Sequence, residues 1–487
     1  MDIQEQLASQ AKEIAKLSKR LSAQEKELKE VKVLKKLVEL LQKENEQLRL
    51  ENAHLKERLG LNSKNSSLAP SSTFGKKGLK PLKSKKKRGG QTGHKGMSRS
   101  LLPESEVSEI NQVFAEDRCT CGRQMTFSEP VRHQYYEMPK LSLDLIEVQL
   151  YHSACTCGRQ NKAKRPDGLL PGILGPRLLS WCNMLTAQYH VSRKKVCDLL
   201  AESFDLKISP GTLSHQEQYL SEALKYPVLQ FQEWLKTQKT LYVDETSWKE
   251  SSDKHWVWTA STPQGSVFHI DSSRSQEAFH SLVGHHYEGI ICSDRFRVYE
   301  TLETSRRAVC WAHLVRDFQR IQERAGPSSA IGEALLKQSK RLFEFQSHFQ
   351  EGKLDHSQWI AKMEPVKRAV LKALRKGARL KGAPKSPEQK TAGTCGEILK
   401  VEKALWTFLS HDVELTNNRA ERALRKIVLN RKIQYGSQSE RGSRFVERVY
   451  SILETCQQQE RSAWAFCEEA LRAHFGSLQY PSLLPST

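Results

Sequence analysis

Two short apolar runs, each leading into an aspartate, constrain the fold of this chain more than any other feature of its sequence. Leu241–Val243 precedes Asp244, and Ile290–Cys292 precedes Ser293 and Asp294. Apolar runs of this length predict buried β-strands. We therefore expect each aspartate to close a strand, although an aspartate in that position is also ordinary turn chemistry.

The chain between the two aspartates predicts the rest of a sheet. Residues 256–259 and 267–270 form two further apolar runs, and residues 276–282 have helical spacing. Three antiparallel strands, a helix and a fourth strand beside the first are how a ribonuclease-H-like sheet begins, and that order would bring Asp244 and Asp294 together. Carboxylates held close together repel each other unless a cation lies between them. The pair therefore predicts a site for two Mg²⁺ ions about 3.5–4 Å apart, which can activate a water or a 3′-hydroxyl.

Glu421 is expected to supply a third carboxylate from a helix. It shares a helical face with Leu424 and Val428, and that face should pack on the sheet. An ion pair with Arg425 on a solvated face is the alternative, and Glu454 on a later helix is a rival third acid. The basic side chains around Glu421 that would line a groove for DNA are Arg419, Arg422 and Arg425.

Residues 1–59 predict a long helix that pairs with a second copy, or with more copies, as a coiled coil. Leucine recurs every seven residues at Leu34, Leu41, Leu48 and Leu55. The repeat is continued upstream, in a shifted phase, by Leu7, Ile14, Leu21 and Leu28. The shift implies a stammer near Val31, and the seam positions Asn45 and Asn52 favour a parallel dimer in one register. A long solvated helix packed on its own chain is the alternative.

Residues 60–104 predict a flexible basic linker. The segment between Lys76 and Arg99 holds ten basic residues and no acid, so it buries too little apolar surface to offset its ordering entropy. Together with a formal net charge of +21, it indicates a nucleic-acid partner, because each neutralised phosphate releases a condensed counterion. A solubilising linker would have the same composition. The densest cluster, which we expect to contact DNA, is Lys85, Lys86, Lys87 and Arg88.

A hexapeptide, Cys-Thr-Cys-Gly-Arg-Gln, occurs at residues 119–124 and again at 155–160, within a cysteine-rich module of residues 105–165. Four cysteines would complete a tetrahedral zinc site: Cys119, Cys121, Cys155 and Cys157. The C-x-C spacing also fits reduced structural cysteines, and His133 and His152 are alternative ligands. A strand-like stretch at residues 143–151 predicts a small ribbon between the pairs.

The remaining cysteines of the eleven are scattered, which is typical of a reducing compartment. Apolar residues make up 38% of the chain, which is enough for real cores, but no run of about 18 of them predicts a membrane span. The N-terminus lacks the apolar stretch of a secretion signal. We therefore expect a cytoplasmic protein with no membrane partner.

Two further regions have helical periodicity. Residues 170–236 predict a helix-turn-helix-like region in which Ser192 and Ser209 cap helices, although a plain helical spacer fits equally well. Residues 321–410 predict a helical insertion, with a basic loop at 376–390. The insertion would divide the core into residues 237–320 and 411–475, followed by a tail of residues 476–487. The predicted fold class is multidomain α/β: a coiled coil, a cysteine-rich module and a ribonuclease-H-like core.

Together these motifs resemble the insertion-sequence-66 family of DDE transposases along most of the chain. The matching segments are Asp244–Thr246, Asp294–Tyr299, Cys310–His313, Asn417–Arg422 and Ser451–Thr455. The N-terminal zipper, the basic segment Gly89–His94 and the cysteine-rich module are similar as well. The resemblance implies a ribonuclease-H-like core in which Asp244, Asp294 and Glu421 are the metal ligands, with a helical insertion between the second and third acids.

The resemblance also implies an activity. A DNA transposase of a bacterial insertion sequence hydrolyses a phosphodiester bond at an element end and joins the freed 3′-hydroxyl to target DNA. Its partners would be double-stranded DNA of the ends and the target, a second copy of the chain and, in some elements, accessory proteins. A non-catalytic, domesticated or regulatory dimeric DNA-binding protein is the alternative, and a nuclease that cuts without joining is a third.

The sequence departs from the family pattern at two places. The cysteine pairs are C-x-C where the family usually has C-x-x-C, and Thr416 stands where many relatives have aspartate. The second departure should not matter if Glu421 is the ligand. Cys310 and His313 form a C-x-x-H pair that recurs in such enzymes, and we interpret it as a structural or substrate-positioning element, with a metal site as the alternative.

Overall fold

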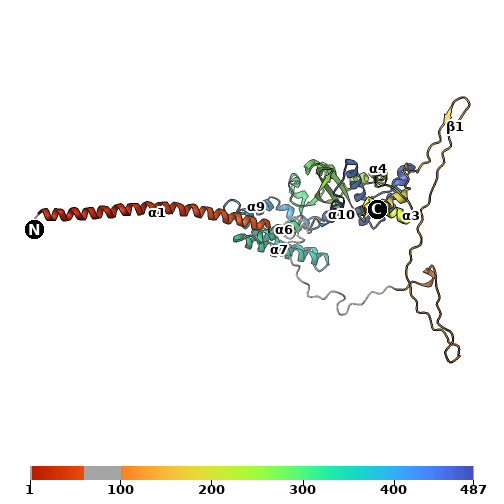
Figure 1. The fold of residues 1–487 in the computed structure, drawn as a ribbon, viewed down its shortest axis with the longest axis horizontal. Coiled ribbons are helices and arrows are strands. Elements are labelled where there is room, and N and C mark those ends of the chain that lie inside the picture. The colour runs from red at the N-terminus through yellow and green to blue at the C-terminus, as the bar shows by residue number, and fades with distance from the viewer. Residues whose placement is uncertain (1–2, 60–99, 486–487) are drawn as a thin grey trace. The chain divides into compact units, whose positions relative to one another are not determined.

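The structure is a computed structural model that describes residues 3–59 and 100–485 (Figure 1). The described residues form two compact units, one of residues 100–149 and 197–208 and the other of the rest. The basic cluster Lys85–Arg88 and the segment Gly89–His94, for which the sequence predicts DNA contacts and a family motif, lie outside the described residues.

Residues Ile3–Leu59 form one helix, α1, as the heptad pattern predicts (Figure 1). The helix continues through Val31, so the change of phase there does not interrupt it. The apolar seam of α1 is exposed, including Leu34, Leu41 and Leu48. The long helix is therefore confirmed, whereas the pairing of two such helices stays a prediction.

A five-stranded sheet carries the two aspartates. Its strands are β3 (Thr240–Glu250), β4 (Asp253–Thr262), β5 (Gly265–Asp271), β6 (Ile290–Ser293) and β7 (Arg307–Val309). They lie in the order β5-β4-β3-β6-β7, with β3, β4 and β5 antiparallel and β6 parallel to both β3 and β7. Helix α5 (Gln276–Val283) connects β5 to β6. The predicted order of three antiparallel strands, a helix and a fourth strand beside the first is confirmed.

Asp244 does not close its strand, so that prediction was wrong for β3. The strand continues from Asp244 to Glu250 and stays paired with β4 to its end. The polar sequence after Asp244 remains extended because Trp248 is buried, and its indole N–H donates to Ser437 Oγ at 3.1 Å. What ends beside Asp244 is the neighbouring strand. Because β6 stops at Ser293, Asp244 lies where β3 loses its parallel partner.

Three helices form the C-terminal part of the chain, and the first two of them cover this sheet. They are α10 (Asn418–Gln434), α11 (Glu440–Gln458) and α12 (Ala463–Gly476). α10 packs against β3 and β4, and α11 lies along the edge strand β5. The N–H groups of Ser266 and Phe268 on that edge donate to Thr455 Oγ1 at 3.1 Å and to Ser451 Oγ at 3.0 Å. The motif Ser451–Thr455 thus covers a strand edge that would otherwise be open to pairing with another chain.

Three helices occupy the region predicted to resemble a helix-turn-helix. They are α2 (Pro176–Ala187), α3 (Arg193–Phe204) and α4 (Pro210–Leu235). The predicted caps are present: Ser192 Oγ accepts the N–H of Lys195 at 3.4 Å, and Ser209 Oγ accepts the N–H of Thr212 at 3.0 Å. α4 is 26 residues long and packs against α11 and α12. The helices are confirmed, and their use as a DNA-binding motif stays a prediction.

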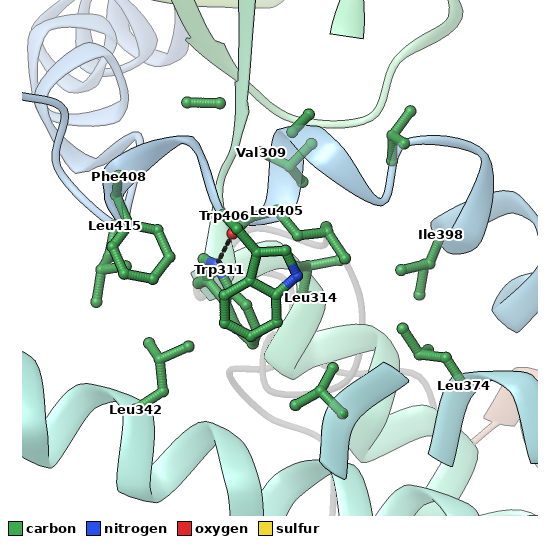
Figure 2. Packing of buried hydrophobic residues seen from close by; sticks show 14 of the residues in the cluster. Val309, Trp311, Leu314, Leu342, Leu374, Ile398, Leu405, Trp406, Phe408 and Leu415 are labelled. Carbon is green, nitrogen blue, oxygen red and sulfur yellow. Dashed lines mark hydrogen bonds between the residues drawn. The ribbon is translucent and has the colours of Figure 1, made fainter. Parts of the chain in front are cut away.

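The region predicted as a helical insertion is helical, and its buried core continues into the sheet at Tyr242, Cys292 and Val309. Its helices are α6 (Trp311–Gln322), α7 (Pro327–Gln350), α8 (His356–Ala378) and α9 (Pro387–Lys400). Trp311 lies at the centre of this core, where its indole N–H donates to Leu405 O at 2.9 Å and its ring meets Trp406 edge-on (Figure 2). The basic loop is shorter than predicted, because α8 and α9 leave only residues 379–386 between them. None of the helices in the described part of the chain combines the length and apolar character of a membrane span.

The smaller elements lie between these helices and strands. Short 3₁₀ helices span Glu104–Glu106, Arg297–Thr301, Thr304–Arg306, Lys403–Leu405 and Thr407–Leu409. Residues 143–151 form no strand, so the ribbon predicted there was wrong. Alternation of apolar residues specifies a strand only where one face is buried, and Leu145 and Ile146 are 99% and 80% exposed. The strands β1 (Ser153–Ala154) and β2 (Gln160–Asn161) pair instead around the second hexapeptide.

Candidate active site

Asp244 and Asp294 lie side by side because of the register of β3 and β6. Tyr242 pairs with Cys292 in this parallel ladder, and each aspartate follows two residues later. Side chains two residues apart on a strand leave the same face, and neighbouring strands lie about 4.8 Å apart. Asp294 follows β6 directly, as predicted. Both carboxylates are half-buried at the edge where β6 ends.

Asn417 fixes the helix of the third acid to the sheet. It is buried at the start of α10, and its Nδ2 donates to the carbonyl of Val243, the residue before Asp244, at 2.7 Å. The Asn417 carbonyl accepts the N–H of Glu421 at 3.1 Å, so Glu421 lies in the first turn of the helix that Asn417 begins. The third carboxylate is therefore positioned through a direct contact with β3.

Cys310 links the end of β6 to the same helix. Its N–H donates to the carbonyl of Ser293, the residue before Asp294, at 2.9 Å. Its Sγ accepts the N–H of Asn417 at 3.1 Å. One chain of hydrogen bonds thus runs from Ser293 through Cys310 and Asn417 to Val243. Asp294 follows Ser293, Asp244 follows Val243, and the N–H of Glu421 donates to the carbonyl of Asn417. This supports the structural alternative among the roles predicted for the C-x-x-H pair.

The three carboxylates concentrate negative charge at this point. The pKa of Asp244 is raised well above its ordinary value, first by burial and then by the charges of Glu245, Asp294 and Glu421. Burial is the chief reason that the pKa of the His313 imidazole is lowered. His313 Nδ1 lies 3.6 Å from Glu421 Oε1. These two atoms are buried without a hydrogen-bond partner in the described structure. An unsatisfied carboxylate oxygen in a concentrated negative site is what a divalent cation would satisfy.

The rival arrangements for the third acid are absent from the described structure. Glu454 lies on α11, where Lys426 Nζ contacts its Oε2 at 2.8 Å. Glu421 forms no salt bridge with Arg425 among the described residues; its Oε2 lies 3.8 Å from Arg316 of α6 instead. Of the two acids, Glu421 is the one whose charge raises the pKa of Asp244.

Glu245 belongs to a network on the opposite face of β3. Side chains alternate along a strand, so Glu245 points away from the face of Asp244. The Tyr299 hydroxyl donates to Glu245 Oε2 at 2.6 Å, and Arg274 Nε donates to Glu245 Oε1 at 2.8 Å. The Arg274 guanidinium also lies 3.4 Å from the ring centre of Phe296. Sequence reasoning missed Arg274 and gave Tyr299 no role of its own. The period of two along β3 is the signal that could have placed Glu245 on the face opposite Asp244.

The arginines predicted to contact DNA on α10 have different surroundings. Arg422 and Arg425 are exposed. Arg419 is half-buried, contacts Glu414 in a salt bridge and lies over the ring of Tyr242, 5.5 Å from its centre. Arg419 thus braces α10 against β3, whereas Arg422 and Arg425 are the two that face solvent.

The two cysteine hexapeptides fold alike. Gly122 N–H donates to Cys119 O at 2.8 Å and Gly158 N–H donates to Cys155 O at 2.9 Å, with φ of 85° and 88° at the glycines. In each turn the backbone N–H of the second cysteine lowers the pKa of the first thiol. Such a turn can present two sulfurs to one ion. Cys119 and Cys155 belong to different units, so a shared zinc ion stays a prediction.

Comparison with known families agrees with this geometry. A family model described as Transposase IS66 family matches residues 171–445, more than half of the chain. This chain belongs to the IS66 transposase family. The resemblance seen in the sequence is thereby confirmed, and membership in a transposase family implies DNA as the partner and DNA cutting as the activity. The matched segment includes Asp244, Asp294 and Glu421 and ends before Glu454.

Two further similarities lie within and beyond this segment. A model of a family of unknown function matches residues 6–100, which contain most of α1 and the basic linker. The uncharacterized protein y4hP of Sinorhizobium fredii is 24% identical over 376 residues, covering 69% of this chain and 67% of that protein. The N-terminal region of this IS66 transposase family member thus forms a sequence unit separate from the part that carries the acids.

Proposed function

We propose that this chain is a DDE transposase that cuts DNA at the ends of a bacterial insertion sequence and joins the freed 3′-hydroxyl to target DNA. The observation that carries the proposal is the hydrogen-bonded chain from Ser293 to Val243, which gathers Asp244, Asp294 and Glu421. A purely structural role for three gathered acids is disfavoured, because their mutual repulsion raises the free energy of the folded state.

The core around these acids is proposed to be ribonuclease-H-like. Support comes from the order β5-β4-β3-β6-β7, from its antiparallel half β5-β4-β3, and from the packing of α10 on β3 and β4. The first acid lies on the central strand, the second at the end of the adjacent parallel strand, and the third on the covering helix. The helical insertion enters the chain between the second and third acids, as the family resemblance implies.

The residues fit a pair of Mg²⁺ ions. Magnesium prefers carboxylate oxygens; Asp244 and Asp294 would share the metals, and Glu421 would complete the second site. When bound, Mg²⁺ would activate the attacking oxygen and stabilise the leaving one. The chain itself supplies the positioning. Phe296 N–H donates to Asp294 Oδ1 at 2.8 Å and fixes that carboxylate, and Asn417 holds the turn of Glu421 against β3.

The proposed path of DNA runs beside these acids. Arg422 follows Glu421 directly, and Arg425 lies about one turn further along α10 with its side chain exposed. Contacts of arginine with phosphates fix the register of a duplex without reading its sequence. Lys85–Arg88 in the linker are proposed to add further phosphate contacts, so that binding should weaken steeply with salt.

Two parts of the N-terminal half are proposed to organise the complex. The exposed seam of α1, with Asn45 and Asn52, would pair two copies as a parallel coiled coil and so bring two element ends together. The two cysteine turns would each supply two thiolates to a structural zinc ion. Zinc would then stabilise the module between the linker and the core and take no part in cutting.

Replacing Asp244 by asparagine tests the catalytic assignment. The amide keeps the size of the side chain but removes its charge, so binding to end DNA should persist. Cleavage in Mg²⁺ should fall on the order of 1,000-fold, equivalent to about 4 kcal/mol of lost transition-state stabilisation. Asp253→Asn is the matched control, since that carboxylate is exposed at the start of β4, and it should cut like the wild type.

The assay measures nicked and joined products from a duplex that carries an element end. Cleavage by Asp244→Asn at the wild-type rate would refute the assignment. Binding without any cleavage by the wild type would favour the non-catalytic DNA-binding protein, and cleavage without joining would favour the nuclease.

A further inference from the structure

Cys310, His313 and Glu421 bring three different metal-binding atoms to one place. Cys310 is the residue before α6 and His313 lies in its first turn, while Glu421 lies in the first turn of α10. A thiol sulfur, an imidazole nitrogen and a carboxylate oxygen from these residues all lie within 4.8 Å of one another. Among the described residues, this is the one group of three or more His, Cys, Asp and Glu side chains whose possible ligand atoms lie this close together.

The chemistry of this group differs from that of the aspartates. Mg²⁺ takes oxygen ligands and is a poor match for sulfur and imidazole. Thiolate, imidazole and carboxylate together suit Zn²⁺ and ions like it, and three protein ligands leave a fourth position open. Cys310, His313 and Glu421 thus form a set that a softer cation would prefer over the hard cation proposed for the neighbouring acids.

The spacing of the group is close to what such an ion needs. With bonds of about 2.0–2.3 Å, two ligand atoms of a tetrahedral zinc ion lie about 3.5 Å apart. His313 Nδ1 and Glu421 Oε1 are already 3.6 Å apart, and both are buried without a hydrogen-bond partner in the described structure. The sulfur is held in place, because Cys310 Sγ accepts the N–H of Asn417 at 3.1 Å. A shift of about 1 Å by the longer side chains would close the site.

We propose that Cys310, His313 and Glu421 form a second metal site, which binds Zn²⁺ or a similar soft divalent cation with release of the thiol proton. The site uses one ligand of the proposed Mg²⁺ centre, because Glu421 belongs to both. An ion bound through Cys310 and His313 therefore withdraws Glu421 from Asp244 and Asp294, and the two kinds of metal compete. The competition rests on the proposed function, whereas the binding of the soft ion does not.

Cobalt binding to the full-length protein, without DNA or Mg²⁺, tests the site directly. Co²⁺ is the probe, because its bond to a thiolate gives a charge-transfer absorption. The cysteine turns at Cys119 and Cys155 can also bind cobalt, so the measured quantity is the difference between wild type and Cys310→Ser. Wild type should bind one more Co²⁺ per chain than Cys310→Ser. Cys395→Ala, which removes a buried cysteine outside the group, should bind as much as the wild type.

A second pair of variants keeps the test decisive if Cys310→Ser fails to fold. His313→Asn and Glu421→Gln each remove one ligand and should weaken the binding of this cobalt ion by at least about 100-fold, since loss of a group that only orients a ligand already costs about 10–100-fold. Equal cobalt binding by wild type, Cys310→Ser and His313→Asn would overturn the proposal. Addition of Mg²⁺ should weaken cobalt at this site, and an unchanged cobalt affinity would overturn the shared use of Glu421.

The outcomes also separate this inference from the proposed function. Loss of one cobalt ion in the variants, together with no Mg²⁺-dependent cleavage by the wild type, would support the soft-metal site and refute the transposase mechanism. Normal cleavage with no difference in cobalt binding would refute the soft-metal site alone.

Discussion

Asn417→Ala should separate the positioning of Glu421 from its chemistry. The change removes the hydrogen bond from Asn417 Nδ2 to Val243 O, which is 2.7 Å long and buried. A buried carbonyl that loses its donor costs about 1–3 kcal/mol, and the small cavity adds to this cost, while removal of the unpaired Asn417 Oδ1 offsets part of it. The free energy of unfolding should therefore fall by about 2 kcal/mol.

The effect of Asn417→Ala on metal dependence should be larger than its effect on stability. Glu421 would still have its carboxylate, but the turn that carries it would no longer be tied to the strand of Asp244. Groups that orient metal ligands typically change metal affinity by about 10–100-fold. Cleavage of an end-containing duplex, measured against Mg²⁺ concentration, should therefore need at least about tenfold more Mg²⁺ and recover at high concentration.

The neighbouring residue provides the control for Asn417→Ala. Asn418 is exposed at the first position of α10, so Asn418→Ala should stay within about 0.5 kcal/mol of the wild type and keep its Mg²⁺ dependence. Asn417→Asp should be worse than alanine, because it would set a carboxylate against the carbonyl of Val243. If Asn417→Ala lost stability but cut with the wild-type Mg²⁺ dependence, Asn417 would only pack the core, and the positioning argument would fail.

Three further predictions test other parts of the structure. Glu454→Gln should keep cleavage within about twofold of the wild type, because Glu454 contacts Lys426 and not the aspartates. Glu421→Gln should abolish cleavage. The opposite pattern in the same cleavage assay would reverse the choice of third acid. Ser451→Ala should lower the free energy of unfolding, measured in urea, by about 1–3 kcal/mol, because the N–H of Phe268 loses its acceptor. The exposed control Ser252→Ala should leave that free energy unchanged. Equal stabilities of the two variants would show that the edge of β5 does not need the hydrogen bond from α11. Leu41→Lys should convert dimers to monomers in sedimentation equilibrium, whereas the exposed Lys43→Ala should leave the dimer intact; an unchanged mass for Leu41→Lys would refute the coiled coil.

The positions of the two aspartates followed from the sequence because they depend on local patterns. Apolar runs before Asp244 and Asp294 predicted strands, and the helix between them predicted that β6 returns beside β3, while the register of the two strands came from the structure. The length of β3 could not be predicted in the same way. Its second half contains mostly polar residues, and it stays extended because of Trp248, whose partner Ser437 lies far along the chain.

The residues that assemble the site were harder to predict than the acids themselves. Asn417 and Cys310 act through backbone groups of Val243 and Ser293, and a backbone carbonyl leaves no mark on the sequence. The family motifs contained both residues and suggested a structural or substrate-positioning role for Cys310, but they did not indicate these backbone partners. The ribbon predicted at residues 143–151 failed for the converse reason, because its alternating pattern is local and no buried face supports it.

Cys310 helps to position the three acids, and it can also disturb their metal binding. Its sulfur is large and polarisable, which suits an acceptor that must reach Asn417 from the end of β6. The same property makes it a ligand for soft ions once His313 and Glu421 lie beside it. Serine would keep an acceptor but lose both the reach and the affinity for such ions. Cys310→Ser could lose its cobalt ion yet cut with the wild-type Mg²⁺ dependence. In that case the contact with the N–H of Asn417 would need only a hydrogen-bond acceptor at position 310, and metal binding alone would explain why the acceptor is a sulfur.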